Sequence, residues 1–312
     1  MICFYHADND GKCAGFWVNK CGLIDKHGKA FFKIDYGIDF PFEKIHENEI
    51  VYIVDYSIPT EQMDKLLEIT PNVVWIDHHV SAIEKYKDYD KEIAGLRYDG
   101  IAGCMLTYIY FFLMTDSRTG EVINEFDPTF AETAPMFTKL VADYDVWVFK
   151  YGNNTRKFEK GITLYPREPE DRIWFDLLTE ESVLKSDNNG FPIYPRLNAI
   201  YNQGETIIAY RKSLMKDYCE KKGFETTLDG HKCYAVNMAL MGTDDFVIPN
   251  VNDYELLVSF SYDGKIWSYS LRSETVDCSE LAAKYGGGGH KGAAGFSTDI
   301  LILEGSPNGQ TD

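Results

Sequence analysis

Short apolar segments rich in Ile, Val and aromatic residues constrain the fold most strongly, and in the amino-terminal part they cover residues 1–5, 30–34, 50–54 and 73–76. Short apolar runs of this kind, bounded by turn residues, are typical of buried strands. Between the third and fourth runs, Met63, Leu66 and Leu67 have the spacing of one helix face. Strands that alternate with helices form parallel sheets. We therefore predict an α/β fold whose amino-terminal sheet is largely parallel.

The second half of the chain predicts a different organisation. A long helix is expected over 197–219, and strands are expected over 232–238, 254–262 and 266–271, with a hairpin turn at Asp263-Gly264. A short helix over 279–285 follows. The expected division is a first domain over 1–150, a helical connector over 151–222, a smaller α/β domain over 223–303 and a flexible tail over 304–312.

Composition excludes several classes of function. The chain has 312 residues, with 31 Lys and Arg against 49 Asp and Glu, which gives a net charge of −18. Coating a long nucleic acid requires a basic surface, so a long duplex partner is disfavoured. No apolar run reaches the roughly 20 residues of a membrane-spanning helix, and no signal peptide is recognisable. The seven scattered cysteines form no CxxC pair, which favours reduced thiols and a cytoplasmic location.

Carboxylate and imidazole side chains follow three of the predicted strands, and they are His6, Asp8, Asp10, Asp55, Asp77, His78 and His79. Because the carboxyl ends of parallel strands meet at one edge of a sheet, we expect these side chains to lie close together. Each residue alone is more typical of a turn or a helix cap, and it is the combination that predicts a metal site. Mixed imidazole and carboxylate ligands favour Mn²⁺, and the lack of accompanying cysteines disfavours structural zinc.

A second motif predicts an anion site near the carboxyl end. Four glycines, 286–289, precede His290 and Lys291. Glycine allows backbone amides to approach an anion closely. The alternative is a flexible linker, which would not normally lie between a helix and a strand inside a domain. Arg272 at the end of a predicted strand has the geometry to bind phosphate, although a surface ion pair explains it equally well. The candidate substrate-binding residues are Arg272, Ser273, Gly287, Gly288, Gly289 and His290.

In order and spacing, the motifs 6–11 (HADNDG), 54–55 (VD), 77–79 (DHH), 144–147 (YDVW) and 286–295 (GGGGHKGAAG) resemble those of the DHH phosphoesterase superfamily. The resemblance covers roughly residues 1–300, in the branch with a DHH-associated carboxyl-terminal domain. Within that branch, the chain is most similar to the bacterial nanoRNase B type. Lys12 and Cys13 depart from the small residues that the resemblance predicts beside the first motif. Lys12 could contact the substrate phosphate or point to solvent, and we expect its side chain to point to solvent.

The resemblance implies a site for two Mn²⁺ ions, with Mg²⁺ or Co²⁺ as substitutes. The first ion would be held by His6, Asp8 and Asp55, and the second by Asp10, Asp55, His78 and Asp145. Asp55 would bridge the ions and be essential for catalysis. His79 would lie behind the ligands, where it orients one of them or contacts the scissile phosphate. Asp143 is an alternative to Asp145, and Asp77 is expected to have a structural role.

The activity implied is a manganese-dependent phosphodiesterase that degrades short oligonucleotides to 5′-mononucleotides, with a metal-activated hydroxide attacking phosphorus in line. The alternatives are a cyclic mononucleotide or dinucleotide phosphodiesterase, a 3′-phosphoadenosine nucleotide phosphatase, or a nucleotide-binding module without activity. The net charge of −18 favours short substrates over a long tracked strand. The sequence does not fix the oligomeric state and is compatible with a homodimer.

Overall fold

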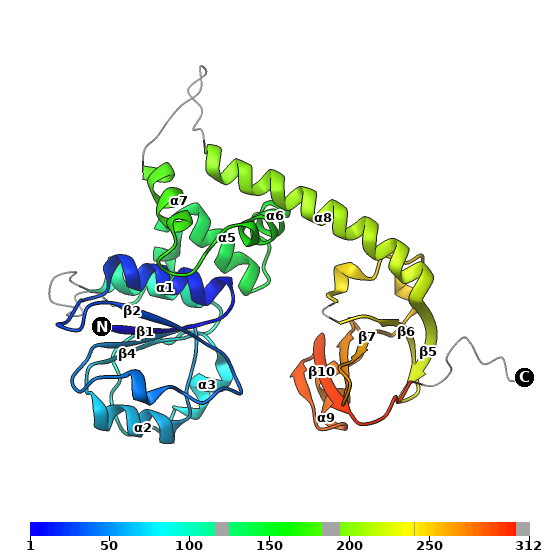
Figure 1. Cartoon of the computed structure of the whole chain (residues 1–312), viewed down its shortest axis with the longest axis horizontal. Helices are drawn as coiled ribbons and strands as arrows, with labels where there is room; N and C mark the ends of the chain where they lie inside the picture. Colours follow the sequence, from blue (N-terminus) through cyan, green and yellow to red (C-terminus); the bar gives the residue numbers. More distant parts are fainter. Residues whose placement is uncertain (116–124, 183–193, 240, 304–312) are drawn as a thin grey trace, which may run out of the picture. The chain divides into compact units, whose positions relative to one another are not determined.

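The computed structural model of the chain describes residues 1–115, 125–182, 194–239 and 241–303. It forms two compact units, Met1–Thr206 and Ile207–Asp312, and the division falls within the long helix α8 (Pro195–Lys222). Figure 1 shows both units, with colours that follow the sequence. The expected tail over 304–312 lies outside the described residues, and the finer domain boundaries expected from the sequence stay predictions.

The first unit is built on a parallel sheet in the order β2 (Ala30–Ile34), β1 (Ile2–His6), β3 (Val51–Val54) and β4 (Val73–Ile76). The predicted α/β class is confirmed, and the predicted strands are found within one residue. The register pairs Tyr5 with Val54 and Val54 with Ile76. The carboxyl ends of β1, β3 and β4 are therefore level, and the residues that follow them lie side by side.

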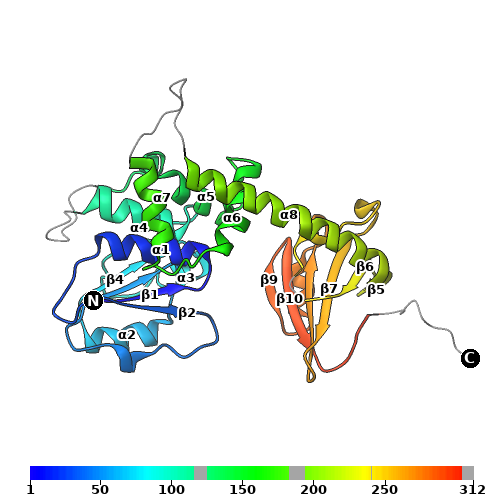
Figure 2. The ribbon, with the colours of Figure 1, turned by 45° about the horizontal axis from the view of Figure 1, so that its top comes forward.

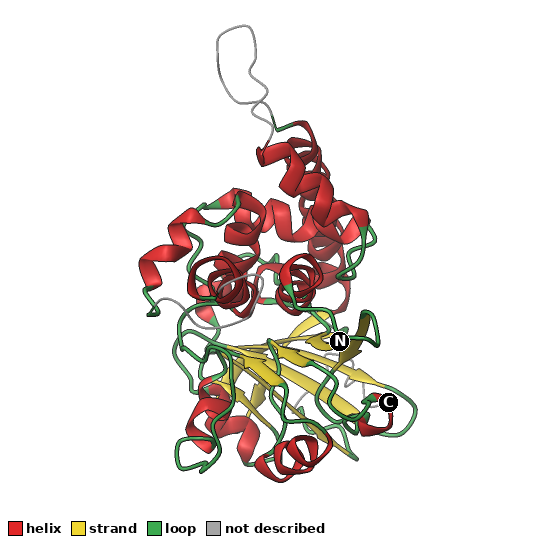
Figure 3. Ribbon diagram, turned by 90° about the vertical axis from the view of Figure 1, so that its left-hand side faces the viewer, coloured by secondary structure: helices red, strands yellow, loops and turns green. Residues whose placement is uncertain are grey.

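Apolar side chains cover both faces of this sheet because successive strand residues point to opposite sides. Cys3 and Tyr5 pack into one core with Trp17, whereas Ile2 and Phe4 pack into another. The first core involves α1 (Asn9–Cys21), and the second involves α2 (Thr60–Ile69) and the region around α3 (Val80–Lys85). Figure 3 shows helices above and below the strands of this unit.

A helical layer extends the first core, and its helices are α4 (Gly103–Ile109), α5 (Met136–Asp145), α6 (Asn153–Gly161) and α7 (Arg172–Ser182). A π-helical turn, Tyr110–Met114, continues α4. Much of this layer lies where the sequence suggested a connector. However, Phe158 and Trp174 are fully buried in the same core as Trp17. The prolines and glycines of this segment separate short packed helices, so residues 151–182 belong to the body of the first unit.

The second unit contains a mixed sheet in the order β5 (Gly223–Leu228), β6 (His231–Asn237), β7 (Leu256–Tyr262), β8 (Trp267–Arg272), β10 (Ala293–Thr298) and β9 (Gly288–His290). Only the β6–β7 pair is parallel. The short helix α9 (Cys278–Ala283) contributes to the apolar core of this unit. Figure 2 shows the strands of this unit. The hairpin predicted at Asp263-Gly264 joins β7 to β8, and Gly264 has a φ of +98°.

Two further expectations concern chain chemistry. All seven cysteines are free, as expected from their scattered positions. Among the described residues, no helix combines the length and the apolar character required to cross a membrane.

Candidate metal centre

The turn between β1 and α1 supplies the first three candidate ligands, His6, Asp8 and Asp10. Asp8 is the N-cap of α1, and its carboxylate accepts a hydrogen bond of 2.9 Å from the amide of Gly11. This cap fixes the direction in which α1 leaves the strand. His6 ends β1 and Asp10 lies in the first turn of α1, so one tight turn carries all three side chains to the carboxyl edge of the sheet.

Asp10 is held in place by the amino terminus of α4. Its carboxylate oxygens accept hydrogen bonds of 2.7 Å from the amide of Gly103 and 2.9 Å from the amide of Cys104. A Cβ atom at Gly103 would lie 2.7 Å from Cβ of Asp55, so only glycine permits this approach. The sequence reasoning missed Gly103. A glycine opening an apolar helical segment was the available signal.

Asp55 lies at the centre of the candidate site. It is 1 % exposed and has a φ of +54°, a left-handed conformation that is uncommon outside glycine. His6 Nδ1 lies 3.6 Å from Asp55 Oδ2, and His78 Nε2 lies 3.2 Å from Asp55 Oδ1. Within the part of the chain that the structure describes, both carboxylate oxygens of Asp55 lack a hydrogen-bond partner, whereas His6 Nδ1 lies 2.8 Å from Asp8 Oδ2. Buried polar atoms of this kind require another partner.

The structure separates the roles of Asp143 and Asp145. Asp145 Oδ2 lies 3.3 Å from His78 Nε2. Asp143 is 6 % exposed, and its carboxylate accepts hydrogen bonds of 2.7 Å and 3.2 Å from the amides of Lys150 and Tyr151. Asp145 therefore joins the candidate site, whereas Asp143 holds the loop that follows α5.

The candidate ligand atoms converge into three groups, in each of which all the atoms lie within 4.8 Å of one another. The groups are His6, Asp8 and Asp55; Asp10, His78 and Asp145; and Asp55, His78 and His79. Asp55 and His78 each occur in two groups. The arrangement therefore has the donor atoms for two neighbouring cations that share a carboxylate.

Burial and neighbouring negative charges disfavour the ionised form of the carboxylates in the site. Burial, together with the charge of Asp8, raises the pKa of Asp55 to about 8, and burial beside Asp10 raises the pKa of Asp145 to about 7. Burial alone would lower the pKa of His6, but Asp55 and Asp8 raise it to about 11. Excess negative charge in a buried cluster is the environment that a divalent cation neutralises. The residues present therefore fit a metal ion.

Asp77 does not belong to these groups, and it orients His79. Asp77 Oδ1 accepts hydrogen bonds from the amides of His78 and His79 and from His79 Nδ1, at 2.8, 3.2 and 2.7 Å. The bond to the ring raises the pKa of His79 to about 9. It also leaves Nε2 as the nitrogen available for an external group.

The expectation that Lys12 points to solvent is wrong. Its side chain is buried, and Nζ lies 3.1 Å from Glu168 Oε1. The hydroxyl of Tyr5 donates a hydrogen bond of 2.5 Å to the same carboxylate. The aliphatic part of a lysine packs well against apolar neighbours when an acidic partner receives its ammonium group. Glu168, which is distant in sequence, supplies that partner.

Asn9 is a second residue that the sequence reasoning missed. It stands between two candidate ligands and is 8 % exposed. Its amide donates a hydrogen bond of 2.8 Å to Glu159 Oε2, and its carbonyl oxygen accepts one of 2.6 Å from Arg167 Nε. These bonds tie the β1–α1 turn to the helical layer. The position of Asn9 inside the HADNDG motif was the available signal.

The substrate-binding candidates of the second unit gather at one end of its sheet. Arg272 pairs with Ala293 in the β8–β10 register, and Ala293 pairs with His290. Arg272 Nη1 donates to the carbonyl of Leu271 at 2.8 Å. The hydroxyl of Ser273 is engaged in a turn, where it donates 2.6 Å to the carbonyl of Glu255.

Gly287 and Gly289 of this region serve close packing. Gly288 and Gly289 lie in β9, and the amide of Gly287 closes α9 by donating to Ala282 at 3.0 Å. A Cβ atom at Gly287 would lie 2.1 Å from the carbonyl oxygen of Gly295. Gly289 has a φ of +144°. The linker alternative therefore does not describe these residues, because they are part of the folded unit.

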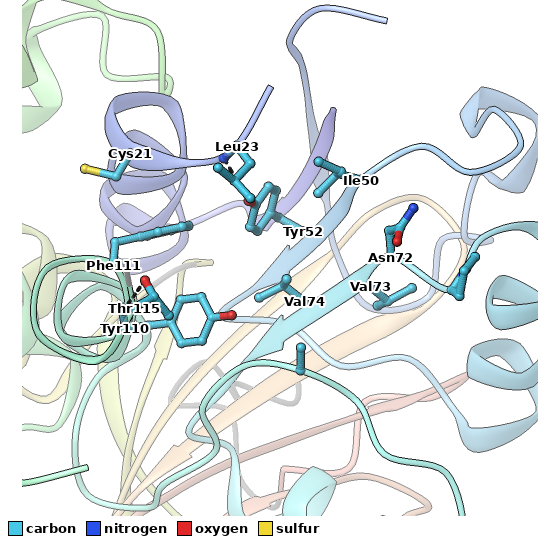
Figure 4. A pocket seen from close by; sticks show the side chains of 12 residues that line it. Cys21, Leu23, Ile50, Tyr52, Asn72, Val73, Val74, Tyr110, Phe111 and Thr115 are labelled. Carbon is cyan, nitrogen blue, oxygen red and sulfur yellow. Dashed lines mark hydrogen bonds between the residues drawn. The ribbon is translucent and has the colours of Figure 1, made fainter. Parts of the chain in front are cut away.

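A separate cavity of about 280 Å³ occurs in the first unit, with Tyr52, Tyr110 and Phe111 in its lining (Figure 4). Ile50 and Asn72 also line it, and they precede β3 and β4. The cavity thus lies at the amino ends of the strands. The candidate ligands follow the carboxyl ends, so the cavity is not part of the candidate metal centre.

Comparisons with known proteins give one sequence relative. No family model matches the chain. The uncharacterized protein R106 of Acanthamoeba polyphaga mimivirus is 26% identical over 261 residues, which are 80% of this chain and 53% of the relative. The chain thus spans about half the length of the curated relative that it matches.

Solved structures share the fold. A DHH domain from a protein described as a member of a family of ribosomal proteins has a TM-score of 0.53 and 14% identity, and the match covers 94% of this chain and 81% of that one. PggH of Vibrio cholerae, a pGpG-specific phosphodiesterase, has a TM-score of 0.51 and 12% identity, and the match covers 96% of this chain and 93% of that one. The chain shares the fold of these two structures.

Proposed function

We propose that the chain is a phosphodiesterase that depends on two divalent cations, Mn²⁺ in the first place, and hydrolyses short oligonucleotides to 5′-mononucleotides. The observation that carries this proposal is the buried carboxylate of Asp55. Neither of its oxygens has a hydrogen-bond partner among the described residues, although His78 lies 3.2 Å and His6 3.6 Å away, and two groups of candidate ligands meet at it. A carboxylate in this position is costly unless it neutralises cations.

In this proposal, His6, Asp8 and Asp55 hold one ion, and Asp10, Asp55, His78 and Asp145 hold the other. Two such ions, when bound, supply an activated water nucleophile and stabilise the charge that develops on the phosphoryl oxygens. A ligating imidazole is neutral, so His6 would hold a cation in its deprotonated form. The Gly103 and Cys104 amides keep Asp10 oriented throughout.

His79 is proposed to contact the scissile phosphate. Asp77 fixes its Nδ1 and favours the protonated ring, so Nε2 is the atom that donates to a phosphoryl or leaving oxygen. The substrate-binding candidates Arg272, Gly288, Gly289 and His290 remain proposals for the second unit. Ser273 would contribute less than expected, because its hydroxyl already donates to Glu255.

The metal requirement is tested by thermal unfolding with and without Mn²⁺. A cation that binds only the folded protein at about 100 times its Kd stabilises it by about 2.7 kcal/mol. We expect Mn²⁺ to raise the Tm of the wild-type protein. The Asp55→Asn variant keeps the shape of the side chain and removes a costly buried charge, so its Tm without metal is expected to be unchanged or higher. Its response to Mn²⁺ is expected to be lost. An equal response of the two proteins contradicts the proposed site.

The substrate class is tested by product analysis with Mn²⁺. The substrates are a labelled dinucleotide, an oligonucleotide of about 24 residues, cyclic AMP, a cyclic dinucleotide and pyrophosphate. The specificity of the neighbour PggH makes pGpG the first dinucleotide to include. Preferential release of mononucleotides from dinucleotides supports the proposal. Cleavage of a cyclic substrate alone would keep the metal site and replace the substrate, and hydrolysis of none would leave a binding module.

A further inference from the structure

An exposed aromatic side chain follows the candidate ligand Asp145 by two residues in the sequence. Trp147 is 59 % exposed, and Val148 after it is 66 % exposed. By contrast, Trp17, Trp75 and Trp174 are buried. Exposing a tryptophan together with an apolar neighbour is unfavourable in water. Packing in the core does not explain why these two side chains are present, and adjacent exposed apolar residues are typical of binding surfaces.

The backbone that presents Trp147 is held in a costly conformation. Trp147 has a φ of +58° and Phe149 a φ of +56°, values that bulky residues rarely adopt. The buried carboxylate of Asp143 maintains this shape. It accepts hydrogen bonds from the amides of Lys150 and Tyr151 on the far side of the loop. Strain that the surroundings maintain in this way is characteristic of functional segments.

Neighbouring rings and a cation fix the orientation of Trp147. Its ring centre lies 5.2 Å from that of Tyr144, at 69°, and 4.7 Å from that of Phe149, at 72°. Both contacts are edge-to-face. The guanidinium of Arg156 lies over both rings, 4.2 Å from the centre of Phe149 and 5.6 Å from the centre of Trp147. The cluster thus combines an indole that is 59 % exposed with positive charge.

This cluster, which consists of Tyr144, Trp147, Phe149 and Arg156, is close in sequence to a candidate ligand. Trp147 follows Asp145 by two residues, directly after the end of α5. Asp145 belongs to one of the three convergent groups. A phosphate at the cations would therefore bring the rest of a nucleotide close to the aromatic cluster.

We propose that Trp147 is the stacking surface for a nucleobase of the substrate, with Arg156 providing positive charge beside it. This inference rests on the proposed nucleotide phosphodiesterase function and deepens it. Every base has a π-face that stacks on an aromatic ring, so the surface accepts any base and favours nucleotides over base-free phosphates. It also supplies affinity within a single nucleotide unit, which suits a short substrate.

Binding is tested by Trp fluorescence in the presence of Mg²⁺, with 5′-AMP as the ligand and ribose 5-phosphate as the base-free control. We expect 5′-AMP to quench the wild-type emission and ribose 5-phosphate to leave it nearly unchanged. The Trp147→Phe variant keeps an aromatic ring and should lose the quenching while binding 5′-AMP in competition assays. Trp267→Phe in β8 is the matched control and should respond like the wild type. Equal quenching of wild type and Trp147→Phe would overturn the inference.

Kinetics with Mn²⁺ separate this inference from the proposed function. Trp147→Ala is expected to raise the KM for a dinucleotide by roughly tenfold or more with little change in kcat, because it removes a binding contact. Its inhibition by ribose 5-phosphate should be unchanged. An active Trp147→Ala enzyme with the KM of the wild type overturns the stacking surface alone. Wild-type protein that hydrolyses nothing but shows quenching at Trp147 overturns the proposed function and supports the nucleobase site.

Discussion

At the scale of single residues, Asp143 and Asp145 show how position on a helix separates two roles. Residues two apart in a helix point in different directions, since each residue turns the chain by about 100°. Asp143 points to the loop amides at Lys150 and Tyr151, and Asp145 points to His78. The sequence predicted a carboxylate from this motif but left the choice between the two open, because both roles call for the same side chain.

We expect the two Asn variants of this pair to fail in different ways. Asp145→Asn should lower hydrolysis by more than roughly 100-fold, because it removes a ligand, and its free energy of unfolding without metal should not fall. Asp143→Asn should lower the free energy of unfolding by about 2 kcal/mol, because the amide group opposes donors that require an acceptor. Denaturant unfolding in chelator and assays with Mn²⁺ measure both effects. The reverse pattern would assign the ligand role to Asp143.

Glu168 predicts a pH effect on stability. Burial alone would raise its pKa, but Tyr5 and Lys12 lower it below the ordinary value of 4.5. A carboxyl group whose folded pKa is lowered contributes stability above its unfolded pKa, and this contribution is lost as the pH falls through the folded value. We expect Glu168→Gln to cost about 1 kcal/mol at neutral pH, a small value because the carboxylate is partly exposed. The difference from wild type should shrink below about pH 4.5. A difference that grows in acid would contradict this assignment.

At the scale of elements, the sequence predicted the strands of the first unit because they are short, apolar and separated by clear turns. Because the ends of these strands could be recognised, the carboxylate and imidazole residues that follow them predicted a candidate site there. The α4 amino terminus was not predicted as part of the site. Its contribution to Asp10 comes from the Gly103 and Cys104 amides, which every residue except proline carries and which leave no trace in side-chain pattern.

Three other elements were not predicted individually, for related reasons. The strand β5 contains Thr and Glu and lies at the sheet edge, so its sequence lacks a strong apolar alternation. The helices α6 and α7 were assigned to a connector because prolines and glycines dominate their flanks. Their burial depends on Phe158 and Trp174 meeting Trp17, a contact between distant segments. Local pattern does not encode such a contact.

The close contact between Gly103 of α4 and Asp55 predicts that adding a single methyl group at Gly103 disturbs the site. Gly103→Ala would place Cβ 2.7 Å from the Asp55 side chain, so either α4 or Asp55 has to shift. We expect an unfolding free energy lower by about 1–3 kcal/mol and a weaker Tm response to Mn²⁺. Gly242→Ala is the control, since the nearest atom there is Asp245 Oδ2 at 3.9 Å. Equal Mn²⁺ responses of the two variants would show that α4 does not position the candidate ligand.

At the scale of the whole molecule, each unit has its own apolar core, and each gathers its candidate residues at one end of its sheet. The division of labour that the sequence suggested, with metal ligands in the first unit and substrate contacts in the second, is compatible with this layout. The net charge, by contrast, is a property of the complete chain. With 31 basic and 49 acidic side chains, the net charge of the chain repels phosphate.

This charge predicts how salt affects the choice of substrate length. A dinucleotide places its phosphates at the cations, whereas an oligonucleotide of about 24 residues also places many phosphates over acidic surface. Raising NaCl from about 0.02 M to about 0.3 M shortens the screening length and weakens that repulsion. We expect kcat/KM for the long strand to rise several-fold relative to the dinucleotide, measured with both substrates in one mixture so that general salt effects cancel. A ratio that falls with salt is the behaviour of a basic binding surface. In that case, local cations such as Arg156 and Lys160 would govern substrate binding, and the net charge of −18 would not.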